Sequence, residues 1–310
     1  MRKQSLLLFI FSLGITLSCF AQVRWNTDSV LPVGDDLLKL AQSDAAPKKQ
    51  VTIATFKDVR LINQQTLECL GPRTLNVEIS HRFGALNSGS YNAYGIDGPA
   101  NIRIGLDYSY DGRLTAGVGR TSIDKLYDGY LKYRLIRQLD NDVMPFSVTL
   151  YSSIVYTGLI DPTETITGQD KYFYPSDRLS YTNEIMIGRK FSNRFSFQLS
   201  GFLVHNNLTL NIGDKNDVYA IGGCVRYKVT RSFALTAEYA YRVNKYTTTP
   251  SSYYDSAGIG FEIETGGHVF QIHLTNSLSI TESEYIPFTT TSWSNAGIRI
   301  GFNISRAFHL

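Results

Sequence analysis

Histidine and hydroxyl side chains that would suit a hydrolase are few and scattered in this sequence. Nucleophilic catalysis needs a nucleophile, a histidine base and an orienting group in contact with one another. The histidines are His81, His205, His268, His273 and His309. The nearest constellation is His273 with Thr275 two positions on and Asn276 beside it, and ordinary strand polarity explains these residues better. We therefore expect no enzyme and no catalytic residue, and keep a lipid hydrolase only as the third-ranked hypothesis.

Metal and cofactor chemistry has no clearer signature. The histidines, cysteines and carboxylates show no metal-ligand spacing. Gly117-Val118-Gly119 is followed by no helix, which argues against a phosphate loop. Cys69 and Cys224 lie far apart in the chain, and we interpret them as unpaired small residues rather than a disulfide. We expect no metal and no cofactor, and the absence of a basic patch argues against nucleic acid.

The charged side chains do show order, because they gather on one parity of alternating segments. Apolar residues occupy the other parity, as in Ile102, Ile104 and Leu106. Unpaired charges facing lipid are costly, so this parity is predicted to line the inside of a barrel. The predicted lumen-lining residues are Arg82, Arg103, Asp107, Asp128, Lys132, Arg134, Glu184, Arg226, Glu238, Arg242, Glu262 and Arg299.

The stretch 179–204 shows the element that carries such residues. Apolar and polar residues alternate over 179–191, the turn residues Ser192, Asn193 and Arg194 follow, and the alternation resumes to residue 204. This period of two predicts a β-hairpin. Each strand has about twelve residues, and a tilted strand needs about 9–11 residues to cross a bilayer.

Segments of the same kind run from residue 73 to the end of the chain and number about twelve. They predict an all-β fold, an antiparallel up-and-down transmembrane β-barrel. Short turns near 111–113, 140–142, 192–194, 230–232 and 265–267 alternate with longer loops, among them 84–99, 159–177, 206–216, 243–253 and 277–295. Outer-membrane barrels have an even strand number, short periplasmic turns and longer extracellular loops. An even number places both termini in the periplasm.

The N-terminal region predicts export. Arg2 and Lys3 precede an apolar run, and Cys19-Phe20-Ala21 resembles a cleavage site before Gln22. We expect residues 1–21 to be a signal peptide, cleaved before Gln22 rather than lipidated at Cys19. Residues 22–72 are expected to be a periplasmic N-terminal extension or plug-like segment, and 73–310 the barrel. For residues 51–69 an extra strand, a periplasmic flap and a segment in the barrel mouth all remain open.

Several pieces of residues 55–138 resemble a known family. They are Thr55-Phe56-Lys57, Arg60-Leu61-Ile62-Asn63, His81-Arg82-Phe83-Gly84, Leu86-Asn87-Ser88-Gly89, Gly95-Ile96-Asp97, 102–108, 117–120, Tyr127-Asp128-Gly129, Lys132-Tyr133 and Arg137-Gln138. The block resembles an outer-membrane β-barrel family of the Bacteroidota that is known only as a domain of unknown function. The resemblance implies an outer-membrane barrel and no activity.

These observations lead to a ranked expectation of function. The first hypothesis is a pore or transporter for small hydrophilic or amphipathic solutes in the cell outer membrane. The alternative is a non-transporting barrel that acts as a scaffold or binding partner for a periplasmic protein. Size alone leaves an open or gated lumen and a packed one equally favoured. Expected partners are outer-membrane lipids and the barrel-assembly machinery. The loop 81–97 is interpreted as a tight turn that needs Gly and Asn backbone angles rather than a gate.

Overall fold

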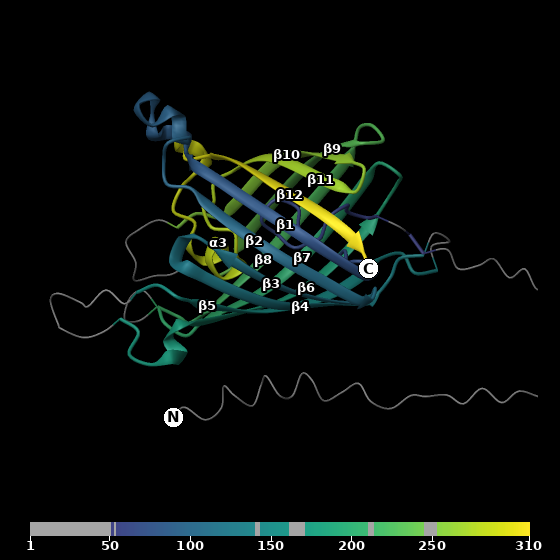
Figure 1. The fold of residues 1–310 in the computed structure, drawn as a ribbon, viewed down its shortest axis with the longest axis horizontal. Helices are drawn as coiled ribbons and strands as arrows, with labels where there is room; N and C mark the ends of the chain where they lie inside the picture. Colours follow the sequence, from purple (N-terminus) through teal and green to yellow (C-terminus); the bar gives the residue numbers. More distant parts are fainter. Residues whose placement is uncertain (1–50, 53, 140–142, 161–170, 210–213, 245–252) are drawn as a thin grey trace, which may run out of the picture. The chain divides into compact units, whose positions relative to one another are not determined.

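Twelve strands close into a single barrel. The computed structural model describes residues 51–310 except 53, 140–142, 161–170, 210–213 and 245–252. Every strand pairs antiparallel with its neighbours in sequence, and β1 pairs with β12 to complete the ring (Figure 1). The predicted fold is confirmed. The predicted signal peptide and the first part of the predicted extension, residues 1–50, lie outside the described residues.

The strands follow the predicted alternating segments. Their bounds are β1 Pro72–Ala85, β2 Asn101–Asp111, β3 Leu114–Thr121, β4 Leu126–Ile136, β5 Ser147–Thr157, β6 Leu179–Lys190, β7 Phe195–Asn206, β8 Asp217–Lys228, β9 Phe233–Arg242, β10 Ser256–Thr265, β11 His268–Thr275 and β12 Arg299–His309. The short helices are η1 Leu86–Ser88, η2 Ser90–Gly95, η3 Ile123–Lys125, η4 Pro175–Arg178, α3 Glu282–Phe288 and η5 Trp293–Asn295. Among the residues that the structure describes, no helix is both long and apolar enough to cross a membrane.

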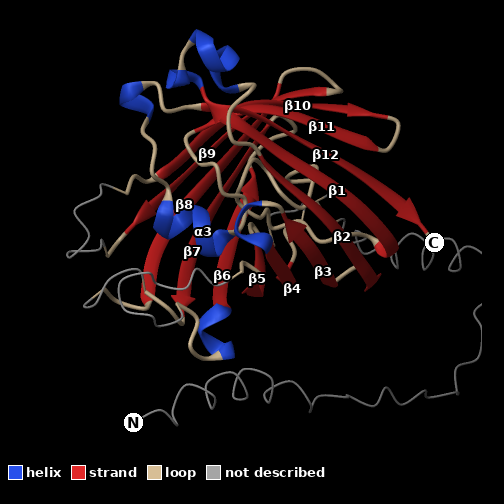
Figure 2. Ribbon diagram, turned by 60° about the vertical axis from the view of Figure 1, so that its left-hand side comes forward, coloured by secondary structure: helices blue, strands red, loops and turns tan. Residues whose placement is uncertain are grey.

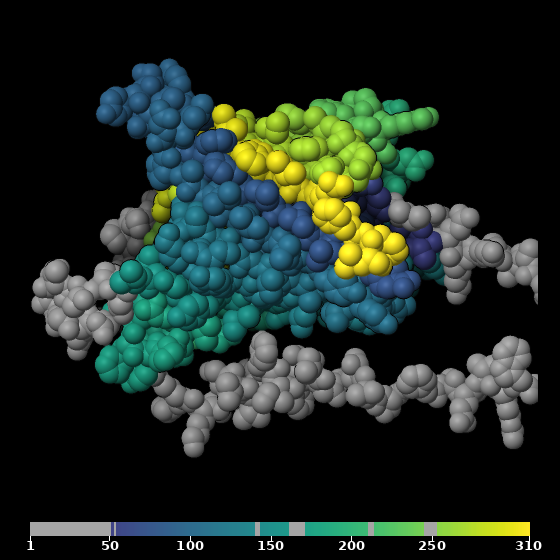
Figure 3. All heavy atoms as spheres, in the orientation of Figure 1, coloured from purple at the N-terminus to yellow at the C-terminus, as the bar shows by residue number. Residues whose placement is uncertain are grey.

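Burial alternates along each strand as the sequence pattern requires. On β2, Ile104 and Leu106 are exposed on the outer face, whereas Arg103 and Asp107 are buried inside. The ring closes because β12 lies against β1 with Ile79 opposite Ile304. In the space-filling view of Figure 3 the yellow C-terminal strand runs directly beside the blue atoms of β1. The barrel therefore has an apolar exterior, a polar interior and no free edge between its first and last strands.

The two ends of the barrel differ in their connections. At the end where β1 begins and β12 ends, called the terminal end here, β2–β3 and β10–β11 are joined by only two residues each. The β4–β5 connection at this end is longer, and the chain before the plug segment pairs with it: Val51 bridges to Leu139, and the Thr52 N–H donates to the Gln138 carbonyl. The predicted turn at 140–142 lies outside the described residues. The chain therefore enters the barrel alongside this connection.

The loop 86–98 is a tight structure outside the barrel. Gly89 and Gly95 have φ of 80° and 93°, and a methyl group on Gly95 would lie 2.4 Å from the Gly84 carbonyl oxygen. The interpretation as a tight loop is thus supported for its glycine angles but wrong for its asparagine angles, because the other residues with positive φ here are Ala93 and Tyr94. The loop projects away from the strands in Figure 1, and the Tyr91 side chain is almost fully exposed.

Two segments fold into the interior of the barrel. One is residues 54–71, called the plug segment from here on, which precedes β1. The other is the β11–β12 loop with α3, at the opposite end to the termini. Figure 2 shows α3 and loop segments within the ring of strands. Of the three possibilities left open for residues 51–69, the structure is nearest to the segment in the barrel mouth, but the segment reaches past the mouth into the lumen.

Candidate functional site

The plug segment makes a narrow hairpin inside the lumen. The Leu61 N–H donates to the Gln64 carbonyl at 2.9 Å across a two-residue tip formed by Ile62 and Asn63, and the next pair of residues bridges antiparallel. Asparagine suits such tips because its side chain mimics a backbone turn. Leu61, Ile62 and Asn63 are each at most 1% exposed. Solvent therefore does not reach the tip, and the lumen is closed at this level.

The barrel wall has hollows that receive side chains of the plug segment. Each hollow lies at an inward-facing glycine, because glycine has no side chain to fill the space. The pairs are Gly188 on β6 with Leu67, Gly222 on β8 with Gln64, and Gly258 on β10 with Ile62. A methyl group built on these glycines would lie 2.2, 2.3 and 3.0 Å, respectively, from the plug atom. The wall is thus shaped to hold this segment at close packing distance.

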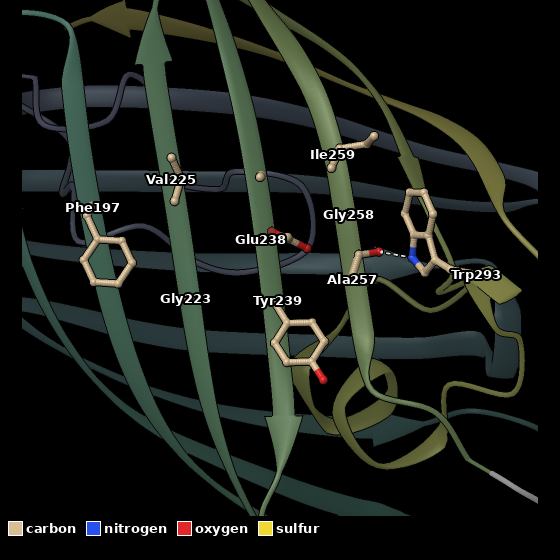
Figure 4. Close-up of a pocket in the computed structure, with 10 residues that line it drawn as sticks. Phe197, Gly223, Val225, Glu238, Tyr239, Ala257, Gly258, Ile259 and Trp293 are labelled. Carbon is tan, nitrogen blue, oxygen red and sulfur yellow. Dashed lines mark hydrogen bonds between the residues drawn. The ribbon is translucent and has the colours of Figure 1, made fainter.

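Glu238 on β9 holds the tip of the plug segment. Its carboxylate oxygens accept hydrogen bonds from three backbone N–H groups, with N···O distances of 2.9 Å to Asn63, 3.0 Å to Gln64 and 3.2 Å to Ile62. Bonds to a charged acceptor are stronger than neutral ones. In Figure 4 Glu238 points to the inside of the strand layer, opposite to Tyr239 on the same strand. One wall carboxylate therefore satisfies three consecutive backbone donors.

The carbonyl groups of the plug segment are bound by wall side chains all around the barrel. The Lys132 ammonium donates to the carbonyls of Val59 at 2.9 Å, Thr66 at 3.2 Å and Glu68 at 3.4 Å. Further donors are Arg82 to Ile62, Asn303 to Leu61 and Ile62, Gln271 to Arg60, Gln198 to Gln65, Thr149 to Leu67, and Arg134 to Cys69.

Other charges pair within the wall. Arg103 contacts Asp128 at 2.6 Å and Glu78 at 3.5 Å, and Arg226 contacts Glu262 at 2.7 Å. All five are buried. These pairs neutralise much of the buried charge of the wall, although Glu262 Oε2 has no hydrogen-bond partner among the described residues.

The loop that carries α3 packs against the inner face of β7 to β9. Tyr285 and Ile286 pack in an apolar cluster with Val204, Val218, Ala220 and Ala240, which are inward positions on β7 to β9. Glu282 of α3 reaches the plug segment, where Arg60 contacts it at 3.1 Å. Arg60 also lies 3.3 Å from Glu78 on β1. Arg60 thus joins the plug segment, the wall and the α3 loop.

At the terminal end, the plug segment leaves a hollow of about 340 Å³ that is lined in part by Asp58 and Asn76. Asp58 accepts hydrogen bonds from the Val59 N–H at 2.7 Å and from the Ser305 hydroxyl. Burial, reinforced by the charge of Glu78, raises the pKa of Asp58 to about 7. The base of the plug segment therefore contains a carboxyl group that titrates near neutral pH.

All twelve predicted lumen-lining residues are buried in the structure. Those that bind the plug segment are Arg82, Lys132, Arg134 and Glu238. Those that bond within the wall are Arg103, Asp107, Asp128, Arg226 and Glu262. Arg242 donates to the Pro287 carbonyl of the α3 loop. Glu184 and Arg299, the remaining two of the twelve, are buried as well.

Among the uncharged plug-binding residues missed from the sequence are Gln198, Gln271 and Asn303. The sequence argument followed charge, and these side chains have none. Their place on the inward parity of β7, β11 and β12 was the available signal.

The residues considered for chemistry are used in structural contacts. Thr275 accepts from the Asn63 side chain at 3.1 Å, and Asn276 donates to the carbonyls of Asp255 and Thr291. His273 packs beside Gly301. Within the described ranges there is no cluster of three or more metal-ligating side chains, and Cys69 and Cys224 are both buried and unpaired. Thr275 and Asn276 thus serve to hold the plug segment and the loops.

A separate hollow of about 440 Å³ lies on the outer face of β8 to β10. Its floor contains Gly223 and Ala257, and Tyr239 and Trp293 stand at its margin, where the Trp293 ring N–H donates to the Ala257 carbonyl (Figure 4). This hollow is apolar and faces away from the lumen. It plays no part in the closure described above.

The chain matches one family, described as a membrane bound beta barrel domain (DUF5777), over residues 56–308. The match includes most of the plug segment as well as nearly all of the barrel. No curated protein matches the chain.

Solved outer-membrane barrels share the general architecture. The NanC porin and the KdgM porin are each 10% identical, with a TM-score of 0.46, covering 76% of this chain and 100% and 99% of theirs. Outer membrane phospholipase A from Escherichia coli is 12% identical with a TM-score of 0.41, covering 75% of this chain and 92% of its own. Likenesses this distant carry no argument about function.

Proposed function

Since the chain belongs to the family of membrane-bound β-barrel domains (DUF5777), we propose that it is a gated conduit of the outer membrane for small hydrophilic or amphipathic solutes. The plug segment is the gate, and the described structure is its closed state. In this proposal the terminal end of the barrel faces the periplasm. The chain reaches the outer membrane after it has been exported and its signal peptide has been cleaved.

One observation carries the proposal: a segment separate from the strands closes the barrel. Twelve strands enclose more space than the eight whose side chains fill the interior. Here the plug segment and the α3 loop occupy that space. The plug segment is held by hydrogen bonds, ion pairs and side-chain packing, and Cys69 within it forms no disulfide with any residue that the structure describes. Water can replace such bonds when the segment moves out, and the wall left behind is polar and charged.

The second candidate is a non-transporting barrel that acts as a scaffold or binding partner for a periplasmic protein. The observation that favours it is the junction at Arg60, where the plug segment, the wall and the α3 loop share buried ion pairs with Glu78 and Glu282. A permanent closure would have the same contacts. The two candidates differ in whether the plug segment moves.

Two full-length variants separate them. The locked variant carries Ile62→Cys with Gly258→Cys, and Cys69 and Cys224 are replaced by serine. A methyl group on Gly258 would lie 3.1 Å from Ile62 Cγ2, which places the two Cβ atoms within reach of a disulfide. The released variant carries Arg60→Ala with Asn63→Ala, which removes plug side chains and leaves the wall intact.

Planar-bilayer recordings test the proposal. We expect discrete openings from the released variant and silence from the oxidised locked variant. A matched control with Ile62→Ser and Gly258→Ser, in the same background without Cys69 and Cys224, should not respond to oxidant. Silence of a folded, heat-modifiable released variant would contradict the conduit and favour the scaffold.

A further inference from the structure

The wall binds the plug segment mainly through its main chain. Wall side chains accept hydrogen bonds from the backbone N–H groups of residues 62, 63, 64, 67 and 70. They donate to the carbonyls of residues 59, 60, 61, 62, 65, 66, 67, 68 and 69. These contacts come from eight strands: β1, β3, β4, β5, β7, β9, β11 and β12. The lumen is therefore complementary to a polypeptide backbone.

Several of these wall groups are suited to any peptide. Gln198 accepts the N–H of Leu67 at 2.7 Å and donates to the carbonyl of Gln65 at 2.8 Å, as a neighbouring β-strand would. Gln271 and Thr149 each donate to one carbonyl. Main-chain groups recur in every peptide, so such contacts give affinity with little dependence on sequence.

The glycine hollows complete the likeness to a peptide site. In peptide recognition by strand addition, main-chain bonds give affinity, and pockets for side chains give specificity. The hollows at Gly188 and Gly258 take the leucine and isoleucine side chains of the plug segment, and the hollow at Gly222 takes a glutamine. They would accept aliphatic or amide side chains of similar size.

Movement of the plug segment leaves these groups with water as their partner in place of protein. Glu238 alone would lose three donors, and Lys132 three acceptors. An occupant that presents the same groups as the plug segment would restore the direct bonds to these wall side chains, and the bonds to the charged ones are stronger than neutral hydrogen bonds. A peptide that folds into a similar hairpin presents them at the same spacing.

We propose that the solute of this barrel is an oligopeptide, which binds in the lumen in the place of the plug segment. This inference rests on the proposed function, because the plug segment must move for the site to open. The plug segment then acts as an internal stand-in for the ligand.

The test is peptide binding to detergent-solubilised full-length protein, measured by fluorescence anisotropy. The probe is a labelled twelve-residue peptide with the composition of residues 59–70 in scrambled order. We expect it to bind the released variant at least tenfold more tightly than the oxidised locked variant. Adding Gln198→Leu and Gln271→Leu to the released variant should weaken binding at least tenfold. Maltohexaose should not compete.

The contrary results are distinct. Equal binding to the locked and released variants, binding of the unscrambled sequence alone, or equal competition by maltohexaose would each overturn the peptide assignment. Openings in a bilayer without peptide binding would also overturn it and leave the conduit standing. Peptide binding to a released variant that never opens would support the peptide site and contradict the conduit.

Discussion

Replacement of Glu238 by alanine is expected to free the tip of the plug segment. The carboxylate accepts three backbone N–H groups at 2.9 to 3.2 Å, and all three would lose their acceptor in the docked state. A buried donor left unsatisfied costs about 1–3 kcal/mol. Taking about 1 kcal/mol each, the low end because water enters the vacated space, docking weakens by roughly 3 kcal/mol, or about a hundredfold.

The assay is the labelling rate of a cysteine at the plug tip. Asn63→Cys in a background without Cys69 and Cys224 reacts with a membrane-impermeant maleimide only when the tip leaves its site. Glu238→Ala should raise this rate about a hundredfold, in line with the docking free energy above. The matched control is Glu262→Ala, which removes a buried inward carboxylate bonded to the wall instead of the plug segment.

The comparison has a clear refuting outcome. An unchanged labelling rate in a folded Glu238→Ala barrel would show that the three bonds do not hold the plug segment. Equal acceleration by both substitutions would show general loosening of the barrel, and the role assigned to Glu238 would be wrong.

Three further changes test other contacts of the plug segment. Gly258→Val should overpack the hollow at the tip and raise open probability, since overpacking costs about 1–3 kcal/mol. Adding Ile62→Ala should reverse the effect, and a failure to reverse it would argue against contact between the two residues. The raised pKa of Asp58 means that the docked state holds a proton between about pH 4 and 7, so docking should weaken as pH rises through this range. Open probability should therefore be lower at pH 5 than at pH 8, and Asp58→Asn should abolish the difference. An unaltered pH response of this variant would exclude Asp58 as the titrating group. In thermal unfolding, a double-mutant cycle of Arg60→Gln and Glu282→Gln should show a coupling energy of about 0.5–3 kcal/mol, whereas additive effects would mean that the plug segment and the α3 loop are independent.

The strands could be predicted from the sequence because each carries its own evidence. Alternation along 179–204 is a local property, and the same period recurs twelve times with turns between. The inward position of charges such as Arg103 follows from this period alone. Their partners do not, because the distance between Arg103 and Asp128 depends on the register of neighbouring strands.

The plug segment could not be placed from the sequence for the same physical reason. Its backbone groups are satisfied by side chains from eight strands, seven of which lie beyond β1 in the chain, so residues 54–71 show no periodicity of their own. The α3 loop was predicted only as a long loop. A signal was present in Val204, Val218 and Ala220, which are apolar at inward positions where the other strands carry polar residues.

The most direct test of the gate is a single-channel recording of the locked variant with Glu238→Ala added, before and after reductant in the same bilayer. The account predicts silence while the disulfide joins the plug tip to β10, and discrete openings once it is reduced. The inserted protein serves as its own control for folding. Continued silence after complete reduction, or openings before it, would contradict the claim that the plug segment gates the lumen.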